Sequence, residues 1–521
     1  MTQTHHMAPV QLSPSHPSII AALQWYADAT PNELAVRWRD TAWSYAVLAD
    51  RAAKFAGALL QTGFARHDRV ALFMENSVEF LIAYFGTWLA RGTVVLINNT
   101  YRQTELRHIL SDSGARVCVT GDSQLADLET VRAELPHLKQ VIEIGVGWDK
   151  FLNTDVLWNH ASLSAPDPDD TAIIAYTSGT TGRSKGALLL HRNIAANAHS
   201  VCEAWQWSAD DHLLLMLPLF HVHGLLVGIS GTVMVGASCE LHKSFVADLA
   251  ANRLASGEFS LFFGVPTMYT RLIVEAHSRH SPKGPDLAAP GVRLFVSGSA
   301  PLSPQTFAEF ERVYGHQILE RYGMTETGMN LTNPYTRERR PGTVGGPFPR
   351  QQARIVDLRS QLPVAAGVVG EIQVRGAHVF AGYLNQIEAT AASFTTDGWF
   401  KTGDLGCASE DGYYTITGRA KELIITGGYN VYPREVEEVL TMCPGVREAA
   451  VFGLPDPEFG ERVCAALVCD APEPTSDEVI AHCKLHLASF KKPRQVFVVS
   501  ALPRNAMGKV VKGELAAQFR T

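Results

Sequence analysis

One segment concentrates glycines and polar side chains of the kinds that bind a polyphosphate. It runs from Tyr176 to Gly186 and follows an apolar run, Thr171–Ala175, that is typical of a buried strand. Glycines let the backbone turn tightly and direct successive N–H groups at one anion, while hydroxyls and a lysine add donors and positive charge. The candidate phosphate ligands are Thr177, Ser178, Gly179, Thr180, Thr181, Gly182 and Lys185. We expect an ATP-binding loop, with a flexible surface loop as the alternative.

The order of residues in this segment differs from the common P-loop. That pattern places a lysine directly after the last glycine, whereas here Gly182 is followed by Arg183 and Ser184 before Lys185. The segment is therefore interpreted as a different kind of phosphate loop.

A second segment, Glu320–Thr327, places an aromatic ring and a carboxylate at the end of a strand-like run. The ring of Tyr322 can stack on a base, and Glu326 offers a hard oxygen ligand for Mg²⁺. The alternative for Glu326 is an acid in the first turn of a helix that Thr325 caps.

Two later positions could also take part in chemistry. Lys401–Asp404 is interpreted as the end of a strand, where the Asp404 carboxylate could accept both hydroxyls of a ribose; an ordinary turn aspartate is the alternative. Leu502–Lys509 is interpreted as a late loop that carries Lys509, a lysine that otherwise would simply be solvated.

Composition bounds the class of protein. With 521 residues the chain is too long for one core, so two or more domains are expected. The net charge of −7 is spread along the chain, and the absence of a basic tract argues against nucleic acid or a membrane surface as partner. Eight scattered cysteines without a C-x-x-C motif, and an N-terminus unlike a signal peptide, predict a cytoplasmic protein with reduced thiols.

Helical and strand patterns alternate along the first two thirds of the chain, which predicts parallel sheets covered by helices. The predicted helices are 45–62 and 75–90, the second too short to span a membrane, and the predicted strands are 69–74, 93–97, 171–175, 212–219, 261–265 and 292–296. After about Pro341, short strands such as 353–356 and 370–374 alternate with Gly and Pro turns, which predicts a small β-rich subdomain.

A third pattern begins after Gly418–Lys421. It predicts a compact α+β unit with a helix that opens at Pro433, strands at 448–452 and 464–469, and a helix at 477–488. The expected fold is therefore α/β, with a large N-terminal domain of helix-covered sheets over residues 1–420 and a small α+β domain over residues 421–521.

Taken together, these motifs resemble the adenylate-forming superfamily, which includes acyl-CoA synthetases, luciferases and the adenylation domains of peptide synthetases. The resemblance rests on their order and spacing and covers nearly the whole chain; its segments are 176–186, 320–327, 402–404, 418–419 and 504–509. It implies a hinge at Lys421 and two half-reactions, in which a carboxylate first attacks the α-phosphorus of ATP and the acyl group then passes to coenzyme A.

The resemblance also implies roles for individual residues. The loop around Lys185 holds the phosphates, Glu326 holds Mg²⁺, and Lys509 bridges the carboxylate and the α-phosphate. The adenosine part is held by residues from four segments, namely Gly298, Ser299, Ala300, Tyr322, Gly323, Thr325, Asp404 and Arg419. Fixed cations and donors lower the barrier of such a reaction by positioning and electrostatics.

In the second half-reaction the small domain turns and Lys509 leaves the site. The backbone of Gly427 and Gly428 then lines a tunnel for the pantetheine thiol, and Lys491, Lys492 and Arg494 are candidates for the 3′-phosphate of CoA. Acylation of Lys509 by a protein lysine acyltransferase would remove its charge and act as an off-switch.

Four segments further resemble malonyl-CoA synthetases: 218–224, 263–271, 297–301 and 321–330. In that family an arginine and a serine hold the distal carboxylate of the acid, and these fall on Arg271 and Ser299. Met329 and Thr232 are expected to limit bulk at the α-carbon. His221 is a candidate for the acyl end, and the alternatives are a hydrogen-bonded core histidine and, for Arg271, a solvated helix arginine.

The expected activity is therefore that of a malonate–CoA ligase with ATP, Mg²⁺ and coenzyme A. Three alternatives stay open: a ligase for another small diacid such as methylmalonate, a medium-chain or aryl acyl-CoA synthetase in which Arg271 is incidental, and an enzyme that transfers the acyl group to a carrier protein. A non-catalytic nucleotide-binding module is the remaining alternative.

Overall fold

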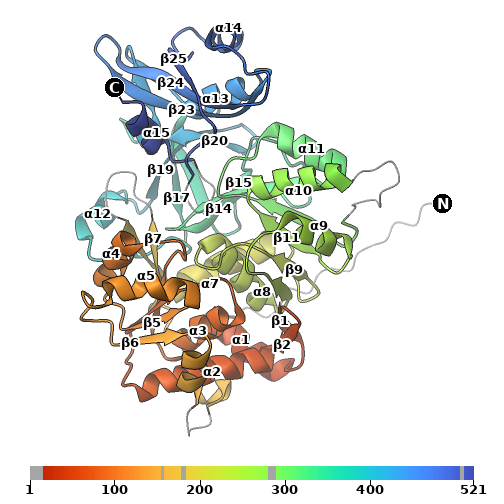
Figure 1. The fold of residues 1–521 in the computed structure, drawn as a ribbon, viewed down its shortest axis with the longest axis vertical. Coiled ribbons are helices and arrows are strands. Elements are labelled where there is room, and N and C mark those ends of the chain that lie inside the picture. Colours follow the sequence, from red (N-terminus) through yellow and green to blue (C-terminus); the bar gives the residue numbers. More distant parts are fainter. Residues whose placement is uncertain (1–15, 154–157, 178–183, 280–288, 505–509, 521) are drawn as a thin grey trace, which may run out of the picture.

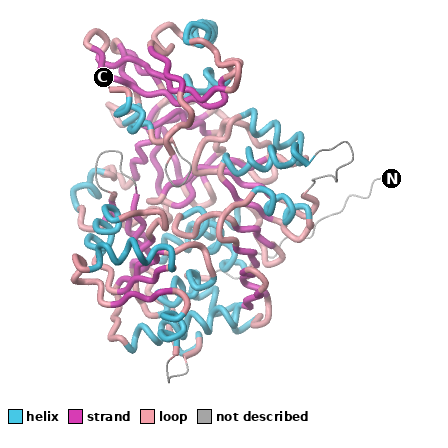
Figure 2. Tube along the Cα trace, viewed as in Figure 1, coloured by secondary structure: helices cyan, strands magenta, loops and turns pink. Residues whose placement is uncertain are grey.

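Figure 1 shows the computed structural model of the chain, which describes residues 16–153, 158–177, 184–279, 289–504 and 510–520. Two large sheets form the body of the molecule, and the C-terminal helices and strands form a separate upper end (Figure 1). Figure 2 shows how helices surround the strands of the body. The expected α/β class, with a larger N-terminal and a smaller C-terminal part, is confirmed.

The first sheet has seven strands in the order β18-β8-β7-β4-β3-β5-β6. Its strands are β3 (Arg69–Phe73), β4 (Thr93–Leu96), β5 (Val117–Thr120), β6 (Gln140–Glu143), β7 (Thr171–Thr177), β8 (Lys185–Leu190) and β18 (Gly382–Tyr383). The strands from β7 to β6 are parallel, whereas β8 and β18 add antiparallel to one edge. The strands predicted at 69–74, 93–97 and 171–175 are confirmed to within two residues.

The second sheet has nine strands in the order β15-β14-β13-β12-β11-β9-β10-β1-β2. They are β1 (Leu34–Trp38), β2 (Thr41–Ser44), β9 (His212–Leu215), β10 (Ser238–Leu241), β11 (Leu261–Gly264), β12 (Leu294–Ser297), β13 (Ile318–Met324), β14 (Gly328–Thr332) and β15 (Gly346–Pro347). The strands from β13 to β1 are parallel. The strand predicted at 212–219 ends at Leu215, because the chain turns at Pro218 toward a helix.

The helices cover both faces of each sheet. They are α1 (Ile19–Ala29), α2 (Tyr45–Gln61), α3 (Val78–Leu89), α4 (Gln103–Ser113), α5 (Asp122–Arg132), α6 (Val146–Leu152), α7 (His191–Ala204), α8 (Ser230–Val235), α9 (Ala247–Ala255), α10 (Pro266–Arg279), α11 (Pro304–Tyr314) and α12 (Ile387–Ala392), with a 3₁₀ turn η1 (His160–Ser162) and a π-helix η2 (His223–Ile229). Serine side chains cap the first turns of α1, α2, α3 and α11, so these helices begin where a hydroxyl can satisfy free N–H groups.

The alternation of side chains along the strands produces a layered body. On β3, Val70 and Leu72 face a core shared with α1–α3, α7 and α8, while Ala71 and Phe73 face α4 and α5. On β11, Leu261 and Phe263 face the same shared core, while Phe262 faces α9–α11. The two sheets therefore enclose one apolar layer, and each sheet carries a further helical layer on its outer face.

Helix α3 occupies the middle of the shared layer, and every residue of it except Glu79 is buried. Trp88 is fully buried and donates its indole N–H to the Ala172 carbonyl at 2.8 Å, which joins α3 to β7. Replacement of such a side chain by alanine costs about 3–5 kcal/mol. The prediction of a core helix here is confirmed, and no helix within the described part of the chain is long and apolar enough to cross a membrane.

The 3₁₀ turn η1 joins the N-terminal helices through a histidine. His160 hydrogen-bonds Asp28 at 2.9 Å and Asp50 at 2.8 Å. Burial opposes protonation of the ring, but the hydrogen bonds to the two carboxylates outweigh it and raise the pKa of His160. The protonated ring therefore stabilises the packing of α1 and α2 against η1.

Two smaller sheets follow in the chain. The β-rich subdomain is a four-stranded antiparallel sheet of β16 (Gln352–Val356), β17 (Gly370–Arg375), β19 (Phe400–Ala408) and β20 (Tyr414–Arg419). The C-terminal part has η3 (Ala420–Glu422), β21 (Ile424–Thr426), β22 (Tyr429–Val431), α13 (Pro433–Thr441), β23 (Val446–Asp456), β24 (Gly460–Cys469), α14 (Ser476–His486), β25 (Gln495–Val498) and α15 (Lys512–Gln518). The predicted elements are confirmed in both parts.

Candidate functional site

The candidate site lies where the carboxyl ends of strands from both large sheets meet the β-rich subdomain. Ligands of open α/β sheets bind at this edge of the strands. The described residues predicted for nucleotide binding lie at the ends of β7, β8 and β13 or directly after β12 and β13, or lie on β19 and β20. The fold therefore brings residues that are far apart in the chain into contact, such as Tyr322 and Asp404, which are 82 positions apart.

The predicted phosphate loop connects two antiparallel strands. Thr177 on β7 pairs with Lys185 on β8, so the two strands form a β-hairpin. The second strand, β8, was not predicted from the sequence. Two hydrogen bonds tie the hairpin to α4: Tyr176 donates its hydroxyl to Asp112 at 2.7 Å, and a ring nitrogen of His108 bonds the Ser184 carbonyl at 2.7 Å. The remaining predicted ligands lie outside the described residues: Ser178, Gly179, Thr180, Thr181 and Gly182.

Glu326 presents a buried carboxylate beside this hairpin. Its residue exposure is 7%, and burial raises its pKa. Tyr383 on β18 donates its hydroxyl to Glu326 at 2.9 Å, and Lys185 lies over the Tyr383 ring, 5.0 Å from the centroid. No helix begins at Glu326; the chain turns into β14. The alternative of a capped helical acid is therefore wrong.

Asp404 forms the centre of a second buried cluster. It accepts a short hydrogen bond from the Tyr322 hydroxyl, and its other oxygen lies 2.9 Å from Arg419 Nε, close but not aligned for a hydrogen bond. The pKa of the Arg419 guanidinium is raised mainly by Asp404, and burial raises the pKa of Tyr322 well above its ordinary value. Lys401–Asp404 lies in the first half of β19 and does not end a strand; its interpretation as a strand end is wrong.

Gly298, Ser299 and Ala300 form the turn that follows β12. Ser299 has a φ of 70°, a left-handed conformation that is uncommon for a residue with a side chain. Its hydroxyl lies 3.4 Å from His223 Nδ1. The turn therefore presents Ser299 beside the buried ring of His223 rather than along the strand direction.

Gly323 and Gly328 allow β13 and β14 to approach closely. A Cβ on Gly323 would lie 2.1 Å from the Gly328 carbonyl oxygen, so only glycine fits there. Met329 is fully buried, and its backbone forms two hydrogen bonds with the side chain of Asn197 on α7. The Met329 N–H donates to Asn197 Oδ1 at 3.2 Å, and the Met329 carbonyl accepts from Asn197 Nδ2 at 2.9 Å. Thr325 is partly buried between these residues and Glu326.

The residues predicted to contact the acid differ in exposure. His221 is partly buried; burial and then Arg321 lower its pKa to about 4, so the ring is neutral at pH 7. Its Nδ1 accepts the His223 backbone N–H at 3.2 Å, which places the proton on Nε2. Thr232 is buried on α8. Arg271 is exposed on α10 and has no ion pair with another described residue, so its contact with the acid stays a prediction.

The residues predicted to serve the second half-reaction lie in the C-terminal part. Gly427 and Gly428, with φ of 57° and 82°, are the two-residue turn between β21 and β22. Both positive φ values are those of a type I′ turn, so the turn alone explains the glycine pair. Lys421 lies in η3, between the last strand of one sheet and the first strand of the next. Lys509 lies outside the described residues.

The candidates for the CoA phosphate have partners within the protein. Lys491 Nζ lies 2.5 Å from Glu435, and the Arg494 guanidinium stacks over the Phe459 ring, 3.7 Å from its centroid. Lys492 is partly buried. Their assignment to CoA stays a prediction.

Sequence reasoning did not find Tyr383, Asn197 or Arg321. Tyr383 and Asn197 contact Glu326 and Met329 from elements that are 57 and 132 residues away in the chain, and nothing in their local sequence marks them. Arg321 adjoins the predicted Tyr322, but the charged Glu320 directly precedes it, so its local sequence does not mark it as a buried residue.

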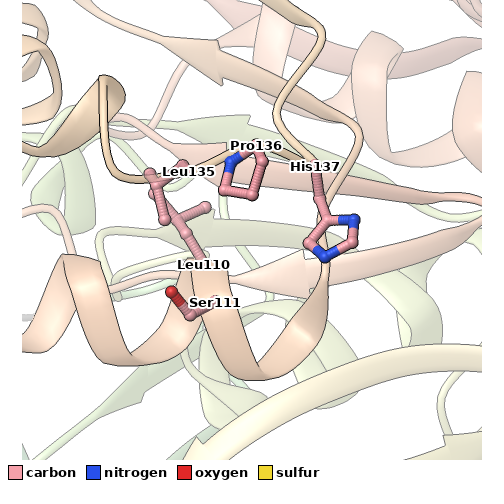
Figure 3. A pocket seen from close by; sticks show the side chains of 5 residues that line it. All are labelled: Leu110, Ser111, Leu135, Pro136 and His137. Atoms are coloured by element: carbon pink, nitrogen blue, oxygen red, sulfur yellow. The ribbon is translucent and has the colours of Figure 1, made fainter.

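Two hollows on the surface lie away from these residues. Leu110, Ser111, Leu135, Pro136 and His137 line a small one between the end of α4 and the segment after α5 (Figure 3). A polar one is bordered by 332–337 and 411–413. Neither contains a predicted site residue, and neither holds a cluster of charged side chains that would favour a phosphate.

Comparisons with known proteins agree on one family. The model of the AMP-binding enzyme family matches residues 23–384, and that of the AMP-binding enzyme C-terminal domain matches residues 435–509. The malonate–CoA ligase of Arabidopsis thaliana is 34% identical over 484 residues, which are 87% of this chain and 78% of the relative. The oxalate–CoA ligase of the same plant is 34% identical over 468 residues, 88% of this chain and 89% of the relative.

Solved structures of related enzymes match nearly the whole chain. ATP-bound MatB from Rhodopseudomonas palustris is 38% identical and matches with a TM-score of 0.90, over 97% of this chain and 99% of that chain. Apo MatB matches over the same shares with a TM-score of 0.79. At equal sequence identity, the arrangement of this chain is therefore more similar to the ATP-bound form.

Proposed function

The chain belongs to the family of AMP-binding enzymes, and from this premise we propose that it is an ATP-dependent malonate–CoA ligase. It forms malonyl-adenylate and pyrophosphate, and then malonyl-CoA and AMP. The observation that carries the proposal is the 34% identity to a malonate–CoA ligase over 87% of the chain. The contacts among Tyr322, Asp404 and Arg419, together with the buried carboxylate of Glu326, support the nucleotide part.

In the first half-reaction the protein positions ATP and the acid for in-line attack. Asp404 and Arg419 hold the ribose, Tyr322 and the 298–300 turn flank the adenine, and the hairpin that carries Lys185 holds the phosphates. Lys509 bridges the attacking carboxylate and the α-phosphate. Negative charge develops on the phosphate oxygens as the bond forms, so fixed cations and donors lower the barrier.

Glu326 suits a Mg²⁺ ion bound together with the ATP phosphates. Its carboxylate is nearly buried, lacks an ion pair with any described residue, and accepts the Tyr383 hydroxyl at one oxygen. Such a hard oxygen ligand is what Mg²⁺ prefers, with the remaining positions taken by phosphate oxygens and water. When bound, the ion neutralises charge on the phosphates.

The second half-reaction requires movement of the C-terminal part, residues 421–521, against residues 1–420. Among the described residues, no strand before Lys421 pairs with a strand after it. The two family models also lie on opposite sides of it, since the first ends at residue 384 and the second begins at residue 435. The different TM-scores to ATP-bound and apo MatB support the proposal that the two parts change their arrangement. After rotation, the backbone of Gly427 and Gly428 lines the thiol tunnel.

Malonate is favoured over other acids by the residues around Ser299. Arg271 and Ser299 hold the distal carboxylate, while Met329 and Thr232 limit bulk at the α-carbon. Burial of Met329 and its two hydrogen bonds to Asn197 support a rigid wall of this kind. Another small dicarboxylic acid is the second candidate substrate, favoured by the match to an oxalate–CoA ligase.

Two further proposals concern the setting of the enzyme. The eight cysteines carry no disulfide, which favours a reducing compartment, the cytoplasm. Acylation of Lys509 by a protein lysine acyltransferase would remove the cation on which adenylation depends.

A panel of acids tests the proposed function. Purified enzyme is incubated with ATP, Mg²⁺ and oxalate, malonate, methylmalonate, succinate, acetate, octanoate or benzoate, with and without CoA, and AMP and thioester are measured. Malonate is expected to give the highest kcat/KM, with AMP and malonyl-CoA in equal amounts. A higher kcat/KM for octanoate or benzoate would assign the chain to general acyl-CoA ligases, and AMP formation without thioester would indicate transfer to a carrier protein.

A further inference from the structure

A short segment, residues 380–384, joins the turn that carries Glu326 to the hairpin of β7 and β8. The Phe380 N–H donates to the Glu326 carbonyl at 2.8 Å, and the Leu384 N–H donates to the Gly186 carbonyl at 2.8 Å. Strand β18 lies between these two bonds and pairs with β8. The segment therefore fixes the position of the Glu326 turn relative to the hairpin.

Tyr383, in this segment, contacts two side chains of opposite charge. Its hydroxyl donates to Glu326 Oε1 at 2.9 Å, and Lys185 Nζ lies over its ring, 5.0 Å from the centroid. Within the described part of the chain, neither Glu326 nor Lys185 forms an ion pair. One ring therefore contacts both a carboxylate and an ammonium group that do not pair with each other.

Neighbouring residues hold the Tyr383 ring in place. Phe380 contacts it edge-on, with 4.9 Å between the ring centroids, and Thr390 Oγ1 accepts the Tyr383 N–H at 2.9 Å. Gly382, with a φ of 144°, allows this close approach, since a Cβ there would lie 2.6 Å from Thr390 Cγ2. A side chain whose own conformation is fixed in this way can orient another group precisely.

The ring satisfies both charges without pairing them. Opposite charges in a partly buried site attract each other, and a direct pair would use the carboxylate oxygens and the ammonium donors that ligands need. The π-face of a tyrosine offers the ammonium group a favourable contact, and its hydroxyl occupies only one lone pair of the carboxylate. Glu326 and Lys185 can therefore both remain available to a ligand.

We propose that Tyr383 is a positioning residue for Mg·ATP, whose hydroxyl orients the Glu326 carboxylate and whose ring keeps that carboxylate apart from the Lys185 ammonium group. The inference rests on the proposed function, because it takes Glu326 and Lys185 as the residues that bind Mg²⁺ and the phosphates. Tyr383 acts through these two residues and takes no part in bond making.

Three variants separate the hydroxyl from the ring. Tyr383→Phe removes the hydroxyl and keeps the ring beneath Lys185, whereas Tyr383→Leu removes both. Glu326→Gln, alone and combined with Tyr383→Phe, completes a double-mutant cycle that shows whether the hydroxyl acts through Glu326.

Tyr413 provides the matched control, because it has the same two kinds of contact elsewhere in the β-rich subdomain. Its hydroxyl donates to the Glu338 carbonyl at 2.8 Å, and the Arg340 guanidinium lies over its ring, 3.9 Å from the centroid. Tyr413→Phe and Tyr413→Leu therefore remove equivalent contacts away from the predicted ligands.

The readout is the Kd for ATP, measured by calorimetry once with saturating Mg²⁺ and once in EDTA. No acid is present, so adenylation cannot occur and the result does not depend on which acid the enzyme uses. Melting temperatures are measured for every variant, and pyrophosphate release is measured at varied Mg²⁺ with the acid that the wild type prefers.

Tyr383→Phe is expected to raise the Kd for Mg·ATP by about tenfold and that for ATP in EDTA by less than about twofold, because the hydroxyl contacts only the Mg²⁺ ligand. In the Glu326→Gln background the same change should have almost no effect. Tyr383→Leu should also weaken binding in EDTA by about threefold, because Lys185 loses its contact with the ring. The melting temperature of Tyr383→Phe should stay within about 4 °C of the wild type, and the Tyr413 variants should bind as the wild type does.

Several outcomes would overturn the inference. An unchanged Kd for Mg·ATP in Tyr383→Phe would show that the hydroxyl does not position Glu326. An equal rise in both Kd values, an equal effect in the Glu326→Gln background, or a Tyr383→Phe variant that fails to fold would show a structural role. A Tyr383→Leu variant that binds ATP in EDTA as tightly as Tyr383→Phe would refute the role of the ring.

These results are distinguishable from a failure of the proposed function. Any of them with a wild type that prefers malonate leaves the proposed function intact. The expected loss in Tyr383→Phe with a wild type that prefers another acid supports the inference and overturns only the proposed substrate.

Discussion

Replacement of Asp404 by asparagine tests the nucleotide site most sharply. Asparagine has the same shape but no charge, and the Asp404 side chain is only 6% exposed. A hydrogen bond to a charged acceptor contributes about 1.5–3 kcal/mol, and one to a neutral acceptor about 0.5–1.5 kcal/mol. The difference is about 1–1.5 kcal/mol for each bond, so two ribose hydroxyls should lose about 2–3 kcal/mol together, which corresponds to a fall in kcat/KM for ATP of roughly 30-fold to 150-fold.

The same change affects stability less than it affects ATP use. Removal of one member of a fully buried ion pair costs about 3–5 kcal/mol, but the Arg419 side chain is 34% exposed and water can solvate part of its charge. We expect a loss of about 1–3 kcal/mol in the free energy of unfolding. The variant should therefore stay folded at assay temperature, so that its kinetics can be measured.

The assay is pyrophosphate release at varied ATP and saturating acid, with melting temperatures measured in parallel. Asp411→Asn is the matched control, because Asp411 pairs with Arg340 at 2.6 Å on the exposed surface of the same subdomain. The reasoning would be refuted if Asp404→Asn lowered kcat/KM for ATP by less than about threefold. It would also be refuted if the control variant lost as much activity.

Four further predictions address other parts of the account. Lys509→Ala should lower adenylation by about a hundredfold to a thousandfold or more and spare thioester formation from preformed malonyl-adenylate; equal loss of both steps would contradict its role. Lys421→Pro should spare adenylation more than CoA transfer, because fixing φ restricts the hinge; single-turnover rates of each step decide this. Arg271→Ala should reduce kcat/KM for malonate by about a hundredfold to a few thousandfold and that for propionate far less; equal losses would show that Arg271 does not select dicarboxylates. His160→Gln should lower the melting temperature. The difference from the wild type should be largest below pH 6.5 and should shrink as the pH rises through the raised pKa of His160. A difference that grows with pH would contradict the ion pairs of His160.

The pKa argument for His160 depends on which state binds the proton more tightly. Its folded pKa is raised, so the folded protein binds the proton more tightly than the unfolded chain does. The stabilisation is complete below the unfolded pKa of about 6.5 and is lost as the pH rises through the folded value. Asp28 and Asp50 are 68% and 46% exposed, so solvent screening keeps the effect small.

The layered fold was largely predictable from local patterns. Strands such as 93–96 are continuous apolar runs because both faces of the sheet are covered, and helix α3 is apolar on all sides because it lies between two sheets. The ends of elements were less predictable. Apolar residues continue to Leu219, but β9 ends at Leu215 because the chain leaves the sheet before the apolar run ends.

The candidate site was predictable where a motif lies within one segment, and not where it is assembled from several. Lys185 and Glu326 are evident in their own segments, but the tyrosine between them, Tyr383, belongs to a two-residue strand with no pattern of its own. Asp404 was expected at the end of a strand, although β19 continues for four residues beyond it. Local sequence does not reveal which strands pair, and pairing decides these positions.

The burial of Arg321 is a further property that the local sequence does not reveal. An arginine next to Tyr322 gives no sign in the sequence of whether its charge is solvated, paired or unpaired. Only the positions of Gly298, His221 and His223, which come from two other segments, establish that it is buried and that it has no ion-pair partner among the residues that the structure describes.

The central claim is that the oxygen of a malonate carboxylate attacks the α-phosphorus of ATP and leaves with AMP. Malonate labelled with ¹⁸O in all four oxygens, incubated with the enzyme, ATP, Mg²⁺ and CoA, tests this directly by mass spectrometry of the products. The account predicts AMP that carries one ¹⁸O and malonyl-CoA that retains three. Unlabelled AMP, label in inorganic phosphate together with ADP, or no product from malonate would contradict it.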